Sequence, residues 1–153
     1  MSAPQEIYDV VGRFLQQAQT DSLKTKDLYP QELLGCTLNV SFGQGNQSHI
    51  PWIALTKNPN KVNQGIYPVL LYYKSQNLLM VAYGISEENP SDFSWDLQSS
   101  TQAIREYFLQ KYAEEPRRYG ASFVFQAYEL NGTVVPEGLA EGLITLTEEY
   151  LEH

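Results

Sequence analysis

The sequence predicts an α+β protein, with a largely antiparallel central sheet flanked by helices at both termini and one in the middle. Apolar residues recur at helical spacing near both ends of the chain, and apolar runs typical of strands occupy the centre. Two of these runs are joined by only four residues, as in a β-hairpin. The 153 residues suit a single domain, and a hydrophobic content of 42% is enough to give it a full core.

One helix and two strands are predicted in the first part of the chain. Residues 5–19 form an amphipathic helix, because apolar side chains recur there between Gln, Asp and Arg. Residues 36–43 alternate between apolar and polar, which predicts a strand. The Gly/Asn-rich segment 43–49 is a flexible loop, and a second strand runs from 50 to about 55. A polar, basic loop follows at 56–65.

The centre of the chain predicts a hairpin whose strands are buried on both faces. Residues 66–73 and 78–83 are near-continuous apolar runs, joined by residues 74–77. Pro68 lies inside the first run and has no N–H to donate to a ladder. We therefore expect Pro68 at an edge position or a bulge.

Two helices and one strand are predicted in the second half of the chain. The first helix is capped by Ser99 or Ser100 and runs to about Lys111. A strand follows at about 122–128, and a last helix opens at Pro136. The side chains expected to face the core are Ile104, Tyr107, Phe108 and Tyr112 in the first helix, and Leu139, Leu143, Leu146 and Tyr150 in the second.

The two ends and the cysteine content indicate the cellular setting. Met1 to Gln5 lack the features of a signal peptide, and no apolar run approaches the roughly 20 residues of a membrane span. Residues 151–153 resemble the start of a vector-encoded histidine tag, so we expect residues 1–150 to be one N-terminal domain of a longer protein. The single cysteine, Cys36, excludes an internal disulfide and suits the cytoplasm.

The charge distribution is uneven. The net charge of −8 argues against a nucleic-acid partner at first. Between Glu32 and Glu87, however, there is no acidic residue, while Lys57, Lys61 and Lys74 lie in that interval. A polyanion would be tolerated by this part of the chain. The alternative is that apolar strands simply exclude charge.

No set of residues in the sequence indicates catalysis, a metal or a cofactor. With His153 assigned to the tag, His49 is the one remaining imidazole, and it lies in a Gly/Asn loop. Cys36 lies in an apolar strand, where a cysteine is typically a small buried hydrophobe. The Gly43–Asn46 segment lacks the lysine of a phosphate-binding loop. We therefore expect a domain that is not an enzyme.

Three aromatic residues lie where predicted loops meet strands. These are Trp52, Tyr67 and Tyr119, each next to a glycine-rich or basic loop. Rings in such places can sandwich an unstacked base, because every base offers a π-face. The alternative is that each ring belongs to the ordinary core.

Several segments resemble the N-terminal domain of the McrB family, in the same order and with the same spacing. They are SFGQGN at 41–46, IPW at 50–52, NQGIYPVLLYYK at 63–74, AYGIS at 82–86, EYF at 106–108 and YG at 119–120. The similarity extends from the first helix to at least Tyr119. The resemblance implies a domain that binds DNA with a modified cytosine next to a purine and flips that base into an aromatic and aliphatic pocket.

The resemblance also implies roles for individual residues. The residues that match the family's pocket are Trp52, Tyr67, Leu71 and Tyr119. Gln44 stands where the family example has a tyrosine that enters the DNA stack, so it is expected to act as the wedge. The basic residues nearest these segments, expected to contact the DNA backbone, are Lys57, Lys61, Arg117 and Arg118. In this family a C-terminal GTPase recruits a separate endonuclease subunit, McrC.

Two other hypotheses remain open at this point. The same fold could bind another modified base, or DNA of any sequence. The acidic net charge instead favours a protein-interaction module.

Overall fold

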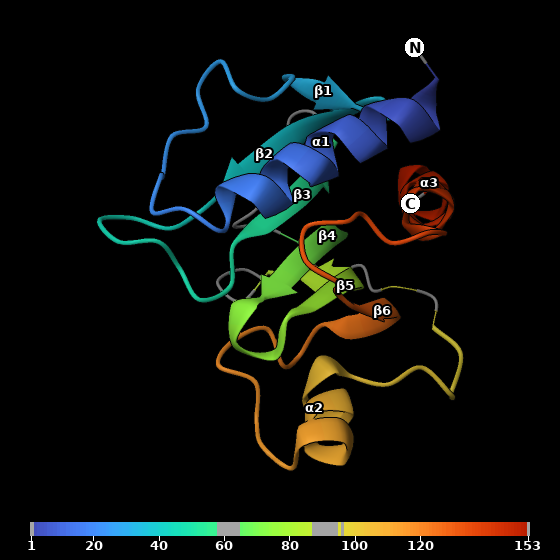
Figure 1. Ribbon diagram of the computed structural model, residues 1–153. Helices are drawn as coiled ribbons and strands as arrows, with labels where there is room; N and C mark the ends of the chain where they lie inside the picture. The colour runs from blue at the N-terminus through green and yellow to red at the C-terminus, as the bar shows by residue number, and fades with distance from the viewer. Residues whose placement is uncertain (1, 58–64, 87–94, 96, 153) are drawn as a thin grey trace.

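Six strands form one antiparallel sheet in which each strand lies beside its neighbour in sequence, from β1 to β6 (Figure 1). The computed structural model describes residues 2–57, 65–86, 95 and 97–152. The strands are β1 (Glu32–Leu33), β2 (Cys36–Ser41), β3 (Trp52–Thr56), β4 (Ile66–Tyr73), β5 (Leu78–Ile85) and β6 (Phe123–Glu129). The helices are α1 (Ala3–Gln17), α2 (Ile104–Tyr112) and α3 (Leu139–Leu151), and a 3-10 turn, η1 (Lys74–Gln76), joins β4 to β5.

The helices lie on both faces of the sheet. Apolar side chains of α1 and α3, such as Phe14 and Leu143, share one core with the sheet face that they cover. Ile104 and Phe108 of α2 belong to a second core on the opposite face (Figure 1). This confirms the predicted α+β architecture, with a helix near each terminus and one in the middle.

Strands β4 and β5 are buried on both faces, as their apolar runs predict. Leu70 and Tyr72 of β4 belong to the core under α1 and α3. The alternate residues Leu71 and Tyr73 belong to the core on the α2 side. Successive side chains of a strand point to opposite faces, so a strand between two cores must be apolar throughout.

Pro68 lies in a central strand, but at a position that is paired on one side only, as an edge position would be. It pairs with Tyr83 of β5. The pairing of β4 with β3 begins one residue later, at Val69 opposite Ala54. Pro68 therefore lies where β4 has a ladder partner on one side, and its missing N–H removes no hydrogen bond.

The predicted start of α2 is wrong. The helix begins at Ile104 and not after Ser99 or Ser100. The preceding residues instead extend the edge of the sheet: Ala103 bridges Phe123, and the Val124 N–H donates to the Gln102 carbonyl over 2.9 Å. The Glu106 carboxylate accepts a hydrogen bond from the Ala103 N–H and so caps the helix in place of a serine.

Two smaller differences concern the N-terminal third. Helix α1 begins two residues before the predicted start, because the Ser2 hydroxyl accepts a hydrogen bond from the Gln5 N–H and so caps the helix. Strand β1 was not predicted, since two residues are too few to show a period. In the described part of the chain, no helix is long and apolar enough to cross a membrane.

Candidate functional site

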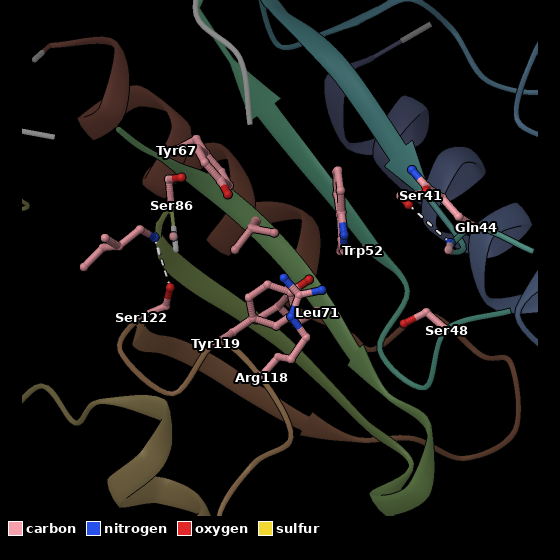
Figure 2. Close-up of a pocket in the computed structure, with 14 residues that line it drawn as sticks. Ser41, Gln44, Ser48, Trp52, Tyr67, Leu71, Ser86, Arg118, Tyr119 and Ser122 are labelled. Carbon is pink, nitrogen blue, oxygen red and sulfur yellow. Dashed lines mark hydrogen bonds between the residues drawn. The ribbon is translucent and has the colours of Figure 1, made fainter. Parts of the chain in front are cut away.

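A cavity of about 360 Å³ opens on the α2 face of the sheet, next to strands β2 to β5. Two loops, 43–48 and 118–122, complete its walls (Figure 2). The four residues predicted to form a pocket all line this cavity: Trp52, Tyr67, Leu71 and Tyr119. Gln44 and Arg118 line it as well. Its volume lies in the lower part of the range for small-molecule sites.

The pairing of β3 with β4 forms the floor of the cavity. Trp52 lies directly opposite Leu71, and Tyr67 lies four residues before Leu71 on the same face of β4. Leu71 is 1% exposed, whereas Trp52 and Tyr67 are half-buried. The floor is therefore aliphatic, with a ring on each side that presents apolar surface to the cavity (Figure 2).

Gly84 makes room for the Tyr67 side of the cavity. It pairs with Tyr67 across β4 and β5. A Cβ at this position would lie 2.5 Å from the Tyr67 carbonyl oxygen and 3.2 Å from its ring. Only glycine allows the two strands and the ring to approach this closely. The Gly84 carbonyl accepts a hydrogen bond from the Trp95 indole over 3.0 Å.

Tyr119 and Arg118 form one wall of the cavity. The Arg118 guanidinium carbon lies 4.7 Å from the centre of the Tyr119 ring, a cation–π distance. Tyr119 has a φ of 69°, which few non-glycine residues adopt. The buried Tyr73 hydroxyl donates to the Arg118 carbonyl over 3.1 Å and holds this loop against β4.

The 43–48 loop presents Gln44 at the rim. Gln44 is exposed, while the residues at the base of the loop are fixed. The Ser48 N–H donates to the Phe42 carbonyl over 2.7 Å, and the Gln47 amide donates to the Ser22 carbonyl over 3.1 Å. Gly43 has a φ of 106°, and a Cβ there would lie 2.8 Å from the Ser48 nitrogen. Glycine is therefore needed for this tight turn.

Two buried serines form the polar end of the cavity. Ser86 and Ser122 are each 3% exposed and lie at the end away from Gln44 (Figure 2). The Ser122 hydroxyl accepts a hydrogen bond from the Ile85 N–H over 3.0 Å. Neither serine was singled out from the sequence, because an isolated serine carries no pattern. Only the fold brings them to the cavity.

No protein-family model matches the chain. It is 39% identical over 115 residues to the Type IV methyl-directed restriction enzyme EcoKMcrB subunit of Escherichia coli K12. The chain is a homologue of the N-terminal region of McrB. The match covers 74% of this chain and 25% of the McrB subunit, so the chain spans about a quarter of that relative's length.

Of the basic residues predicted to contact DNA from their nearness to the pocket segments in the sequence, Lys57 lies apart from Arg117 and Arg118. Arg118 lines the cavity described above, and Arg117 lines a smaller one, as does His49. The Lys57 ammonium lies 4.9 Å from the centre of the Tyr150 ring, in the core on the opposite face of the sheet. Lys61 lies outside the described residues.

The cavity of this McrB homologue suits a flat, uncharged or anionic group. Among the described residues that line it there is one charged side chain, Arg118, and no carboxylate. Trp52, Tyr67 and Tyr119 add three aromatic rings to the wall, each with a face on which a planar group can stack. No group of three His, Cys, Asp or Glu side chains that could hold a metal ion occurs in the described part of the chain.

Proposed function

We propose that this chain is the DNA-reading domain of a modification-dependent restriction system and that it binds duplex DNA carrying a 5-methyl-type cytosine. The observation that carries the proposal is the convergence of Trp52, Tyr67 and Tyr119 on one cavity whose floor is Leu71. These rings come from three separate segments of the chain. The homology to a subunit named as part of a methyl-directed restriction enzyme supports the same function.

The proposed mechanism is base flipping. A cytosine inside a duplex cannot reach a cavity bounded by strands, so the base must leave the stack. Extrusion costs a few kcal/mol, and stacking on aromatic rings contributes about 1–3 kcal/mol per base. A methyl group adds only about 0.8 kcal/mol of apolar burial. Selection of the methyl group therefore depends on close contact with surfaces such as Trp52 and Leu71.

Gln44 and the basic residues would act on the rest of the duplex. Gln44 is exposed at the rim, where its amide could fill the vacated place in the stack and hydrogen-bond to the orphaned guanine. Arg118 and Arg117 are exposed beside the cavity and would contact phosphates.

Homology to the McrB subunit also supports a role for the domain within a larger restriction system. We propose that the domain itself is not an enzyme and needs no cofactor. In the complete cytoplasmic protein, a GTPase region and an McrC-like endonuclease partner would act on the DNA that this domain has bound.

The test compares duplexes of one sequence with 5-methylcytosine or cytosine at the target position. Affinities are measured by fluorescence anisotropy over a range of salt concentrations. We expect tighter binding of the methylated duplex and weaker binding of both as salt rises. We expect Trp52→Ala to lower the affinity for methylated DNA by about 1–3 kcal/mol, because one stacking ring is lost. Leu109→Ala, at an exposed position of α2, is the control.

Each other outcome points to a different function. Equal, salt-dependent binding of both duplexes indicates a sequence-tolerant DNA binder. The absence of any salt-dependent binding favours a protein-interaction module. A folded Trp52→Ala protein with unchanged affinity for methylated DNA would show that the cavity is not the base pocket.

A further inference from the structure

A pocket that recognises only shape and a methyl group cannot distinguish 5-methylcytosine from thymine. Thymine carries the same methyl group at the same ring position and occurs throughout DNA. The two bases differ on the Watson–Crick edge, where ring N3 accepts a hydrogen bond in cytosine and carries a proton in thymine. If the proposed function holds, the pocket therefore needs a polar group that recognises this edge.

Ser122 has the burial and the fixed position that such a group requires. Of the four buried polar side chains in the described part of the chain, two line the cavity, and Ser122 is one of them. Its N–H donates to the Tyr119 carbonyl over 3.1 Å, and its carbonyl accepts from the Ile104 N–H over 2.8 Å. The hydroxyl is therefore held in place before any base arrives.

The hydrogen bonding of Ser122 determines what the hydroxyl can offer a ligand. Its oxygen already accepts a hydrogen bond from the Ile85 N–H over 3.0 Å (Figure 2). Among the described residues, no group accepts the hydroxyl proton in return. A serine hydroxyl carries one proton to donate, so Ser122 enters the pocket as a donor in need of an acceptor.

We propose that Ser122 is the residue that selects cytosine over thymine, by donating its hydroxyl proton to ring N3 of the flipped base. With cytosine, both the oxygen and the proton of Ser122 are then bonded. With thymine, the oxygen would have to accept the N3 proton, and the proton of the buried Ser122 hydroxyl would be left unpaired. An unsatisfied buried donor weakens binding on the order of tenfold.

The experiment compares the affinities for three target bases under conditions in which none of the bases is paired. Each duplex carries 5-methylcytosine, cytosine or thymine opposite an abasic residue, so extrusion breaks no base pair in any of them. Affinities are measured by fluorescence anisotropy for the wild type, Ser122→Ala and Ser122→Cys. Ser22→Ala serves as the matched control, since the Ser22 hydroxyl also accepts a backbone N–H, from Lys24, but lies outside the cavity.

We expect the wild type and Ser22→Ala to bind 5-methylcytosine about tenfold more tightly than thymine. Ser122→Ala should reduce this ratio to near one while keeping the preference for 5-methylcytosine over cytosine. Ser122→Cys has a weaker donor of similar size and should give an intermediate ratio, and it replaces the alanine variant if that variant does not fold. Urea unfolding checks the folding of each variant.

The outcomes separate this proposal from the one on which it rests. If the wild type does not prefer 5-methylcytosine over cytosine, the proposed function fails. If it has that preference but binds thymine equally well, the role of Ser122 is wrong. A folded Ser122→Ala or Ser122→Cys variant that keeps the full ratio of 5-methylcytosine to thymine affinity also overturns the role of Ser122.

Discussion

Arg118 and Lys57 are both basic residues of predicted loops, yet they lie on opposite faces of the sheet. Arg118 lies at the cavity, while Lys57 contacts the Tyr150 ring in the other core. Side chains alternate between faces along a strand, so a shift of one position decides which side a residue at the strand end faces. Nearness to the pocket segments in the sequence therefore does not by itself place a basic side chain at the cavity.

We expect Arg118→Gln to weaken binding of methylated and unmodified DNA about equally, because phosphate contacts carry no sequence information. The slope of log affinity against log salt should fall by about one, as for the loss of one phosphate contact. Lys57→Gln is the matched control and should leave affinity and slope unchanged. Anisotropy titrations at several salt concentrations measure both. A slope lowered equally by Lys57→Gln would place DNA on the other face.

The elements around the site depend on one glycine in β5. Gly84 allows β4 and the Tyr67 ring to lie close together, whereas Gly12 in α1 has no such constraint. A Cβ at Gly12 would lie 3.8 Å from Val135, an ordinary van der Waals distance. The same substitution is therefore expected to have opposite effects in the two elements.

We expect Gly84→Ala to lower the free energy of unfolding by about 1–3 kcal/mol, because the added methyl group meets backbone that cannot move away easily. Gly12→Ala should raise it by about 0.5–1 kcal/mol, since alanine loses less conformational entropy in a helix. Urea unfolding of the three proteins gives both values. If Gly84→Ala were as stable as the wild type, the close approach of Tyr67 would not be a constraint.

At the scale of the whole molecule, the many tyrosines make the free energy of unfolding depend on pH in the alkaline range. The chain has 11 tyrosines, and burial raises the pKa of several of them, including Tyr83, Tyr112 and Tyr128. The clearest case is Tyr29. Burial raises its pKa from 10.0 to about 12, and the Arg13 charge lowers it in part. The Tyr29 hydroxyl donates to the Gln17 side chain over 2.8 Å and joins the 28–30 segment to α1.

We expect the free energy of unfolding to fall as the pH rises from about 10 to about 12. The unfolded chain loses the Tyr29 proton at the lower pH and the folded chain at the higher one. The neutral hydroxyl therefore contributes stability that is fully present below pH 10. Tyr29→Phe should cost about 1 kcal/mol near pH 8, through the lost hydrogen bond. Near pH 11 the free energy of unfolding of Tyr29→Phe should approach that of the wild type. Urea unfolding at the two pH values measures this difference.

A constant difference between the two proteins at both pH values would show that Tyr29 ionises equally in the folded and unfolded chains. A spectrophotometric titration of phenolate absorbance checks this directly. The wild type should show a tyrosine that ionises well above pH 10, and Tyr29→Phe should lack it.

The sequence alone determined the architecture, because periodicity is a local property. The unbroken apolar runs of β4 and β5 predict burial on both faces, and the helical spacing of Leu139, Leu143 and Leu146 predicts the inner side of α3. The start of α2 could not be predicted in this way, since Gln102 and Ala103 bond to β6, which lies about 20 residues later in the chain. At this point, pairing with β6 outweighs the tendency of Ser99 or Ser100 to cap a helix.

The candidate site was predicted from the sequence in part. The McrB resemblance named Trp52, Tyr67, Leu71 and Tyr119, and spacing alone could not show that they line one cavity. Only the tertiary structure brought Ser86 and Ser122 to its polar end and placed Lys57 on the far face. One physical reason explains why the positions of Ser86, Ser122 and Lys57 could not be predicted. A period fixes which face of an element is apolar, whereas a binding site depends on hydrogen bonds and strand pairings between residues that are distant in the chain.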